Sequence, residues 1–252
     1  MRTDILVLVM ILAAAVLSMP IYALGAARRG RDPHEISDRG GFVLGGFVRS
    51  WFYWFVGPVE RGALALRLSP TAFNLLGVGF GVAGGALFAA GWTNPAGWAV
   101  LLGGAMDVLD GRIARARGMA DDRGAFLDST LDRFAEVGAL VGLAVLFRSE
   151  AWAVAAVATA LGGSLLVSYA RARGESVGVV CKVGILQRAE RLLLVGFGGI
   201  LDPAVTSVLG WAPGSLLLGL VVLLAVGTTG TAVYRTVWIA GRLEREGGPR
   251  TP

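Results

Sequence analysis

Four aspartates lie at the ends of two neighbouring apolar segments, where acidic side chains are unexpected. Asp107 and Asp110 come near the end of one segment, and Asp128 and Asp132 come near the start of the next. A charged residue within a membrane span costs at least about 2.5–3.5 kcal/mol on insertion scales, so such residues usually have a function. Residues three or four positions apart share one face of a helix. Each pair is therefore expected to present both carboxylates to the same side.

The spacing of the two pairs predicts that they meet. A turn at 116–123 would join the segments into an antiparallel hairpin, and Asp107 and Asp132 are equally far from its midpoint. At a rise of about 1.5 Å per residue, all four carboxylates should lie within about one helical turn in depth. Hard divalent cations such as Mg²⁺ prefer oxygen ligands of this kind, and two-metal sites commonly serve phosphoryl chemistry. The spacing thus favours a metal site.

Two other interpretations of the aspartates stay open on spacing alone. The carboxylates could pair with nearby arginines in a structural network, namely Arg112, Arg115, Arg123 and Arg133. They could also form the relay of an ion-coupled membrane transporter, which predicts acids scattered over several spans near the bilayer midplane. A Ser-His or Cys-His catalytic system is not expected, because the chain has one histidine, His34, and one cysteine, Cys181.

The composition predicts an all-α, polytopic integral membrane helix bundle. Of the 252 residues, 55% are hydrophobic and only 16% are charged. Soluble domains contain roughly 45–50% apolar residues and about 25% charged residues. A membrane-spanning helix needs about 20 predominantly apolar residues. Seven segments are expected to meet this need: 4–27, 70–91, 96–115, 124–147, 151–170, 189–212 and 214–241.

Basic residues are concentrated on one side of this arrangement. All but three of the 23 Lys and Arg residues fall in four segments, which are 28–69, 112–123, 171–191 and 235–250. Basic loops remain in the cytoplasm, so the aspartates are expected to face the cytoplasm, with the N-terminus outside. Anionic lipids and phosphorylated substrates explain the net charge of +5, and no nucleic-acid partner is expected.

The N-terminal region is expected to lie outside the chemistry-bearing segments. Residues 1–41 are interpreted as a membrane anchor with a polar linker, since signal-peptide cleavage would leave the arginines at 28–31 outside. Residues 42–69 combine clustered aromatic residues with Arg49, which is typical of an interfacial amphipathic helix, although a short, poor span is the alternative. The remaining chain divides into a membrane domain, 70–245, and a polar tail, 246–252.

Gly79, Gly81 and Gly84 match the dinucleotide-binding pattern G-x-G-x-x-G. That fingerprint requires a preceding strand within a βαβ unit, whereas these glycines lie inside an apolar run of helical length. Together with Gly77, they are expected to let neighbouring helices approach closely.

The complete string around the aspartates resembles a known family. It reads Asp107-Val-Leu-Asp110-Gly111-Arg-Ile-Ala114-Arg115, then eight residues, then Gly124-Ala-Phe-Leu-Asp128-Ser-Thr-Leu-Asp132. The string matches every fixed position of the D-x2-D-G-x2-A-R-x8-G-x3-D-x3-D signature of the CDP-alcohol phosphotransferases. The resemblance covers roughly residues 58–241.

The resemblance implies a metal-dependent transferase of phospholipid biosynthesis. Family members have six spans, a site open to the cytoplasm and usually a homodimeric assembly in the cell (inner) membrane. They bind CDP-diacylglycerol (CDP-DAG) or a similar CDP-alcohol with two divalent cations, Mg²⁺ or Mn²⁺. An acceptor hydroxyl attacks the β-phosphorus and CMP leaves. With its anchor, this chain would have one span more than the family.

The resemblance also implies roles for individual residues. The metal ligands would be Asp107, Asp110, Asp128 and Asp132, with Asp132 also serving as the general base. The CDP-alcohol would be bound by Asn74, Asp107, Gly111, Ala114, Arg115 and Asp121. Glycine beside a metal ligand permits close approach of a flat base or a phosphate. Asp121 departs from the pattern, because a small hydroxyl residue stands there in the branch that this chain most resembles.

The acceptor site is predicted from arginines at the cytoplasmic ends of the last three spans: Arg171, Arg173, Arg188, Arg191 and Arg235. A basic patch beside the aspartates suits a phosphorylated acceptor. The arrangement resembles the phosphatidylinositol-phosphate synthase branch, whose acceptor is inositol 1-phosphate. In that branch Arg173, Arg191 and Arg235 would bind the acceptor phosphate, while Arg171 replaces a lysine. Glycerol 3-phosphate and serine stay open as acceptors.

Overall fold

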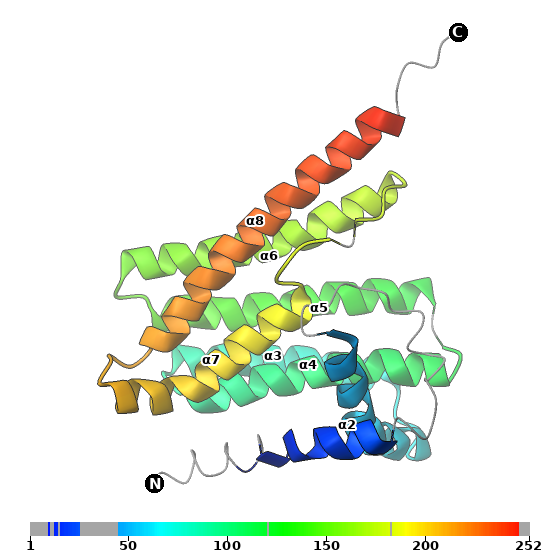
Figure 1. Cartoon of the computed structure of the whole chain (residues 1–252), viewed down its shortest axis with the longest axis horizontal. Coiled ribbons are helices and arrows are strands. Elements are labelled where there is room, and N and C mark those ends of the chain that lie inside the picture. Colours follow the sequence, from blue (N-terminus) through cyan, green and yellow to red (C-terminus); the bar gives the residue numbers. More distant parts are fainter. Residues whose placement is uncertain are drawn as a thin grey trace. The chain divides into compact units, whose positions relative to one another are not determined.

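The computed structural model describes residues 10, 13–14, 16–25, 45–119, 121–181 and 183–246, and every regular element in these ranges is a helix. The all-α prediction is therefore confirmed for the described residues. The chain forms two compact units, residues 1–68 and residues 69–252. The second unit, coloured from cyan to red in Figure 1, includes the positions of all four aspartates.

The first unit contains the helix α2, Gly45–Ala65. Its Trp51 indole donates a hydrogen bond of 2.8 Å to Ser18 Oγ, and the rings of Tyr22 and Phe47 meet edge to face. The interfacial role of this helix stays a prediction. The predicted N-terminal span at 4–27 lies largely outside the described residues, which include a short apolar helix at Val16–Gly25.

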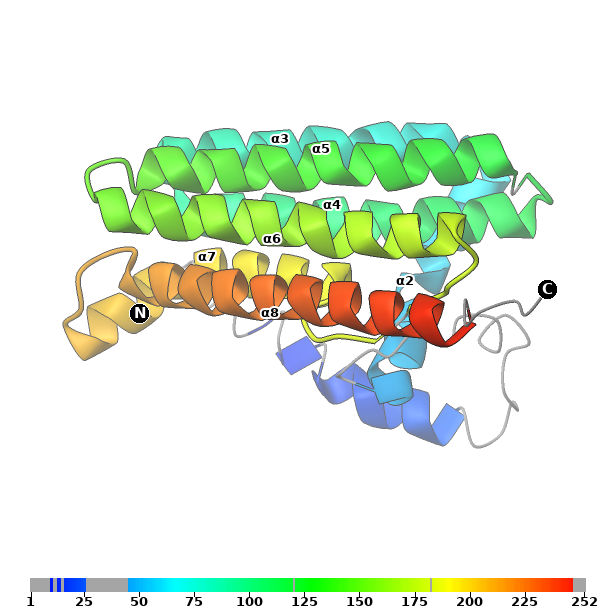
Figure 2. The same cartoon turned by 90° about the horizontal axis from the view of Figure 1, so that it is seen from above.

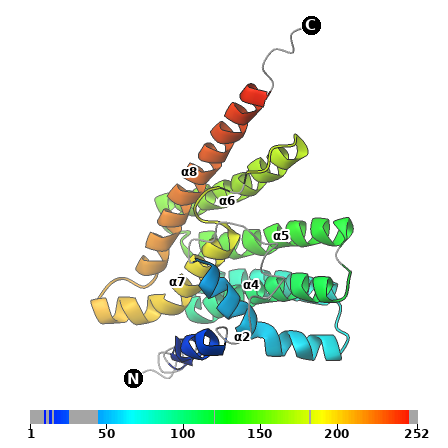
Figure 3. The same ribbon diagram turned by 45° about the vertical axis from the view of Figure 1, so that its right-hand side comes forward.

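The described residues of the second unit form six helices: α3 (Pro70–Ala89), α4 (Thr93–Ala116), α5 (Asp122–Leu146), α6 (Ala151–Ser176), α7 (Arg188–Leu209) and α8 (Ser215–Glu246). Helix α3 lies beside α5, and α6 lies beside α8 (Figure 2). Helix α7 packs against both α4 and α8 (Figure 3). Its packing on α4 brings the start of α7 to the aspartates.

Helices α4 and α5 follow each other after a short turn, as the hairpin prediction requires. They touch each other only slightly, however, because α3 packs extensively against both of them. Asp121 fixes the start of α5, since its carboxylate accepts a hydrogen bond of 2.7 Å from the backbone N–H of Gly124. Such an N-cap satisfies a backbone donor that a helix start leaves unpaired.

Glycines permit the close packing of α3, which confirms the predicted structural role for Gly81 and Gly84. The prediction was wrong for Gly79, because a Cβ atom there would meet no described residue within 4 Å. A Cβ atom on Gly81 would lie 2.6 Å from the Cβ of Ala135, and one on Gly85 would overlap the carbonyl oxygen of Gly138 on α5. A Cβ atom on Gly84 would lie 3.0 Å from a methyl group of Val100 on α4. These contacts leave no room for a side chain.

The substitution Gly85→Ala is expected to destabilise the protein by about 1–3 kcal/mol, the usual cost of overpacking. The matched control is Gly79→Ala on the same helix, where a Cβ atom would meet no described residue within 4 Å. The control should be neutral or slightly stabilising, because alanine favours helix more than glycine does. Thermal unfolding in detergent compares the two variants. Equal midpoints would contradict the packing interpretation.

Four helices of the described part are long and apolar enough to cross a membrane, namely α3, α6, α7 and α8 up to Arg245. Helices α4 and α5, which carry the aspartates and several arginines, do not reach this standard. The prediction of seven spans is thus supported for four of them, and the remaining spans stay a prediction.

Candidate active site

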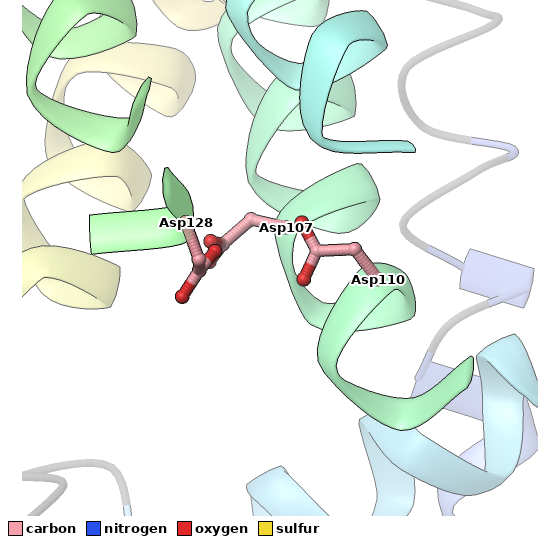
Figure 4. A group of neighbouring side chains, drawn as sticks. All are labelled: Asp107, Asp110 and Asp128. Carbon is pink, nitrogen blue, oxygen red and sulfur yellow. The ribbon is translucent and has the colours of Figure 1, made fainter. Parts of the chain in front are cut away.

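Three of the four aspartates form one cluster. Carboxylate oxygens of Asp107 and Asp110 on α4 and of Asp128 on α5 all lie within 4.8 Å of one another, and Figure 4 shows these side chains converging. Asp110 is only 3% exposed. Three carboxylates this close repel one another unless a cation lies between them.

The cluster fits a divalent cation. Two of its oxygens, Asp110 Oδ2 and Asp128 Oδ1, are buried and have no hydrogen-bond partner among the described residues. A buried polar atom without a partner is costly, and coordination to a hard cation would satisfy it. The residues that would hold the cation are therefore Asp107, Asp110 and Asp128.

Asp132 is not part of this cluster, and Arg188 bridges it to Asp107. The Arg188 guanidinium pairs through Nη1 with Asp107 Oδ2 and through Nη2 with Asp132 Oδ1, the latter at 2.6 Å. The structural-network interpretation predicted arginines of α4, α5 and their turn as partners. The ion pairs at Asp107 and Asp132 come instead from the first residue of α7.

A small cavity adjoins these side chains and is lined by residues of four helices. They include Asn74 and Gly77 of α3, Asp107 and Asp110 of α4, Asp132 of α5 and Arg188 of α7. Asn74, which was predicted to contact the CDP-alcohol, thus shares a cavity with three of the predicted metal ligands.

The other residues predicted to bind the CDP-alcohol lie at the end of α4 and the start of α5. A Cβ atom on Gly111 would have the Arg115 guanidinium as its nearest neighbour, at 3.3 Å, so these two residues lie side by side. Ala114 is half-buried and Arg115 is exposed. Asp121 caps α5, a task that a small hydroxyl residue also performs. Their contacts with a nucleotide stay predictions.

The five predicted acceptor arginines fall into three environments. Arg171 and Arg173 are exposed on α6, where Arg171 pairs with Glu175 at 2.9 Å and Arg173 donates to Ser176 Oγ at 3.3 Å. Arg188 forms ion pairs with Asp107 and Asp132. Arg191 and Arg235 are buried, and they donate hydrogen bonds to a carboxylate or to backbone carbonyls of this chain.

Arg191 is 2% exposed and forms a two-pronged ion pair with Glu136 of α5. Its Nε lies 2.6 Å from Oε1 and its Nη2 lies 3.0 Å from Oε2. Glu136 was not among the residues predicted from the sequence, although its position carries a signal. Glu136 follows Asp132 by four positions in an apolar segment and therefore shares its helix face.

The segment 183–187, which we call the lead segment, is held at three backbone carbonyls. Arg235 Nε donates to Val183 O at 2.8 Å, Thr231 Oγ1 to Ile185 O at 2.7 Å, and Arg191 Nη1 to Leu186 O at 3.1 Å. At its end, Gln187 and Glu190 form a reciprocal capping box. These bonds fix the position from which Arg188 extends.

Removing one partner of the Glu136–Arg191 pair is expected to destabilise the protein by about 3–5 kcal/mol, because a buried charge then remains uncompensated. Glu136→Leu is the informative substitution, measured by thermal unfolding. Adding Arg191→Met should restore most of the loss.

The control for this pair is Glu175→Gln, which breaks the exposed pair with Arg171 and should cost about 0–1 kcal/mol. If Glu136→Leu were as mild as this control, the pair would not hold α5 to α7. A double variant no more stable than Glu136→Leu alone would also contradict the account.

Comparisons with known proteins agree with the sequence signature. The CDP-alcohol phosphatidyltransferase family model matches residues 68–226. The phosphatidylinositol phosphate synthase of Cutibacterium acnes is 36% identical over 142 residues, covering 54% of this chain and 68% of the relative.

Two crystal structures of the Mycobacterium tuberculosis phosphatidylinositol phosphate synthase are also similar. The form with CDP-DAG bound has a TM-score of 0.63 at 31% identity, covering 72% of this chain and 92% of that chain. The form in complex with manganese and citrate has a TM-score of 0.62 at 34% identity, covering 72% and 88%.

Proposed function

Because the chain belongs to the CDP-alcohol phosphatidyltransferase family, we propose that it transfers a phosphatidyl group from CDP-DAG, or a similar CDP-alcohol, to a hydroxyl of inositol 1-phosphate. CMP is released, and the product enters phospholipid biosynthesis. The observation that carries this proposal is the three-aspartate cluster with its unpaired oxygens, formed by residues of the family signature.

The role of the cations follows from the chemistry of the donor substrate, CDP-DAG, which carries a pyrophosphate. Bound at Asp107, Asp110 and Asp128, divalent cations would neutralise the pyrophosphate and stabilise the charge that develops on the departing CMP. Mg²⁺ or Mn²⁺ suits these ligands, and manganese is present in a structure of the similar M. tuberculosis enzyme. Asn74, Gly111, Ala114, Arg115 and Asp121 are proposed to bind the CDP-alcohol.

Asp132 is proposed as the general base and, as the family signature implies, as a further metal ligand. It lines the cavity with Asp107 and Asp110 but is not part of the three-aspartate cluster, and its Oδ1 pairs with Arg188. The acceptor oxygen forms a bond to the β-phosphorus as the bond to CMP breaks, and the hydroxyl proton passes to the Asp132 carboxylate.

The acceptor is proposed from the relatives, whose names specify phosphatidylinositol phosphate synthesis. A phosphorylated acceptor also suits the arginines beside the cavity. Arg188 and Arg173 have the exposure that direct contact requires. Arg191 and Arg235 each use at least two guanidinium N–H groups in hydrogen bonds within the chain. Only their remaining N–H groups are available to bind a phosphate.

The chain is an integral membrane protein, with four apolar helices of spanning length in a family of membrane enzymes. We propose six family spans plus one N-terminal span, an interfacial α2, a homodimer, and a cytoplasmic site in the cell membrane. The uneven distribution of basic residues supports this orientation.

An ion-coupled transporter is the rival from another functional class. Its relay would need acids along the bilayer depth, and Asp202 is the other buried aspartate of the described part. Asp202 instead accepts hydrogen bonds from the backbone N–H groups of Gly214 and Leu217, at 2.8 and 3.2 Å, and so caps α8. This structural use of Asp202 favours the transferase.

The experiment is an acceptor screen with radiolabelled CDP-DAG and the purified chain. Inositol 1-phosphate, glycerol 3-phosphate and serine are compared with Mg²⁺, with Mn²⁺ and with EDTA. We expect CMP release to require a metal and to be fastest with inositol 1-phosphate. A preference for another acceptor would correct the substrate, whereas no release with any metal or acceptor would overturn the transferase assignment.

A further inference from the structure

Arg188 occupies carboxylates that the proposed function assigns to divalent cations. Its guanidinium bridges Asp107 and Asp132, and its side chain is 26% exposed. Asp107 also belongs to the three-aspartate cluster. One carboxylate therefore faces both the guanidinium and the proposed cation position.

The Arg188 guanidinium and a divalent cation compete for Asp107 because both are positively charged. A guanidinium and a divalent cation on the same carboxylate repel each other, and the repulsion is strong where water is largely excluded. The four aspartates alone can balance two divalent cations, so the additional charge of Arg188 is needed only before the metals bind. The metal-free site, in contrast, needs a positive group to hold Asp107 near Asp132.

Arg188 also has a donor that its present position does not use. Its Nε is buried and has no hydrogen-bond partner among the described residues. A guanidinium presents its donors as a planar fork that matches a phosphate. The capping box and the fixed lead segment hold the backbone of Arg188, so a change of partner requires movement of the side chain alone.

We propose that Arg188 is an exchangeable counter-ion of the aspartate site. It pairs with Asp107 and Asp132 while no divalent cation is bound, and metal binding displaces it toward a phosphate of a substrate. Metal binding and phosphate binding are then positively coupled through one side chain. This inference rests on the proposed function, because it takes the aspartates to be the metal site.

The first test measures Mn²⁺ affinity of the purified chain without substrate, from the electron paramagnetic resonance signal of free Mn²⁺. Arg188→Gln removes both the charge and the fork, and should tighten Mn²⁺ binding by about tenfold, the effect of roughly 1.4 kcal/mol of lost competition. Arg188→Lys keeps the charge but cannot bridge both carboxylates with a fork, and should tighten binding less.

The control is Arg133→Gln, which removes a positive charge next to Asp132 on α5 without touching the bridge. It should change Mn²⁺ affinity by clearly less than Arg188→Gln does. If Arg133→Gln and Arg188→Gln had equal effects, a general loss of positive charge would explain both and the exchange would be rejected. Unchanged or weaker Mn²⁺ binding in both Arg188 variants would also reject it.

The second test measures the coupling. In the unmodified chain, inorganic phosphate or CDP should tighten Mn²⁺ binding, and Mn²⁺ should tighten binding of that ligand by the same factor. Arg188→Gln should reduce the coupling to the ligand whose phosphate Arg188 contacts. Part of the coupling to CDP should remain, because the cations would also contact its pyrophosphate directly. A reduction of the coupling to inorganic phosphate identifies the acceptor site, and a reduction of the coupling to CDP identifies the donor site.

Coupling to neither ligand in the unmodified chain would overturn the proposal, as would coupling to both ligands that Arg188→Gln leaves unchanged. These readouts are independent of turnover. A chain that shows the expected Mn²⁺ behaviour but releases no CMP would reject the proposed function, whereas an active chain with unaltered Mn²⁺ affinity in the Arg188 variants would reject only the exchange.

Discussion

Replacing Asp132 with Asn is expected to lower kcat for CMP release by about 10²–10⁴-fold, the usual contribution of a general base. The amide keeps the shape of the side chain but does not take up the acceptor proton. Nucleotide affinity should change little, because the cluster of Asp107, Asp110 and Asp128 remains. Steady-state kinetics with CDP-DAG, together with direct binding of CDP, separates these two quantities.

The matched control is Asp122→Asn, an exposed aspartate in the first turn of α5. It should retain full turnover. The Mn²⁺ affinity of Asp132→Asn shows whether this residue acts mainly as the general base or as a metal ligand. A loss of turnover with normal Mn²⁺ binding indicates a base, whereas parallel losses indicate a ligand. Full activity in Asp132→Asn would remove the general-base role.

Replacing Asp110 with Asn is expected to lower kcat/KM by at least about 10³-fold, because the metal stabilises transition-state charge by several kcal/mol. Asp110 is 3% exposed and contributes an oxygen that no described residue satisfies. Mn²⁺ affinity should fall by more than the roughly 10–100-fold that outer-shell partners cost. Activity should recover partly at high Mn²⁺ concentration.

Asp110→Asn also has an expected effect of opposite sign on stability. In EDTA the substitution removes one of three clustered negative charges, so the thermal midpoint should rise. A residue kept for structural reasons would lower the midpoint when replaced. A lower midpoint with unchanged Mn²⁺ affinity would show that Asp110 is a structural residue and would contradict its assignment as a ligand.

The convergence of the aspartates could be predicted because local geometry determines it. Spacings of three and four residues place Asp107 with Asp110 and Asp128 with Asp132 on common helix faces, and the short turn matches their depths. The close packing of α3 could also be predicted, since glycines inside an apolar helix indicate a close approach. Their partners, such as Ala135 for Gly81, depend on tertiary packing.

The parts that could not be predicted are contacts between helices distant in sequence. Nothing local to Arg188 indicates that α7 packs on α4 and brings this side chain to Asp107. Nothing local to Arg191 indicates its partner either. Its predicted role in phosphate binding came from the family resemblance, whereas its ion pair with Glu136 depends on how α7 lies relative to α5. A single sequence gives the residue types at helix ends but not their partners.

Anomalous diffraction at the manganese absorption edge, from crystals grown with Mn²⁺ and CDP, tests most directly whether α4 and α5 bind catalytic cations between their aspartates. We expect manganese peaks in contact with Asp107, Asp110 and Asp128, with the Arg188 guanidinium displaced from Asp107. A complex that contains CDP but has no manganese at these carboxylates would contradict this expectation.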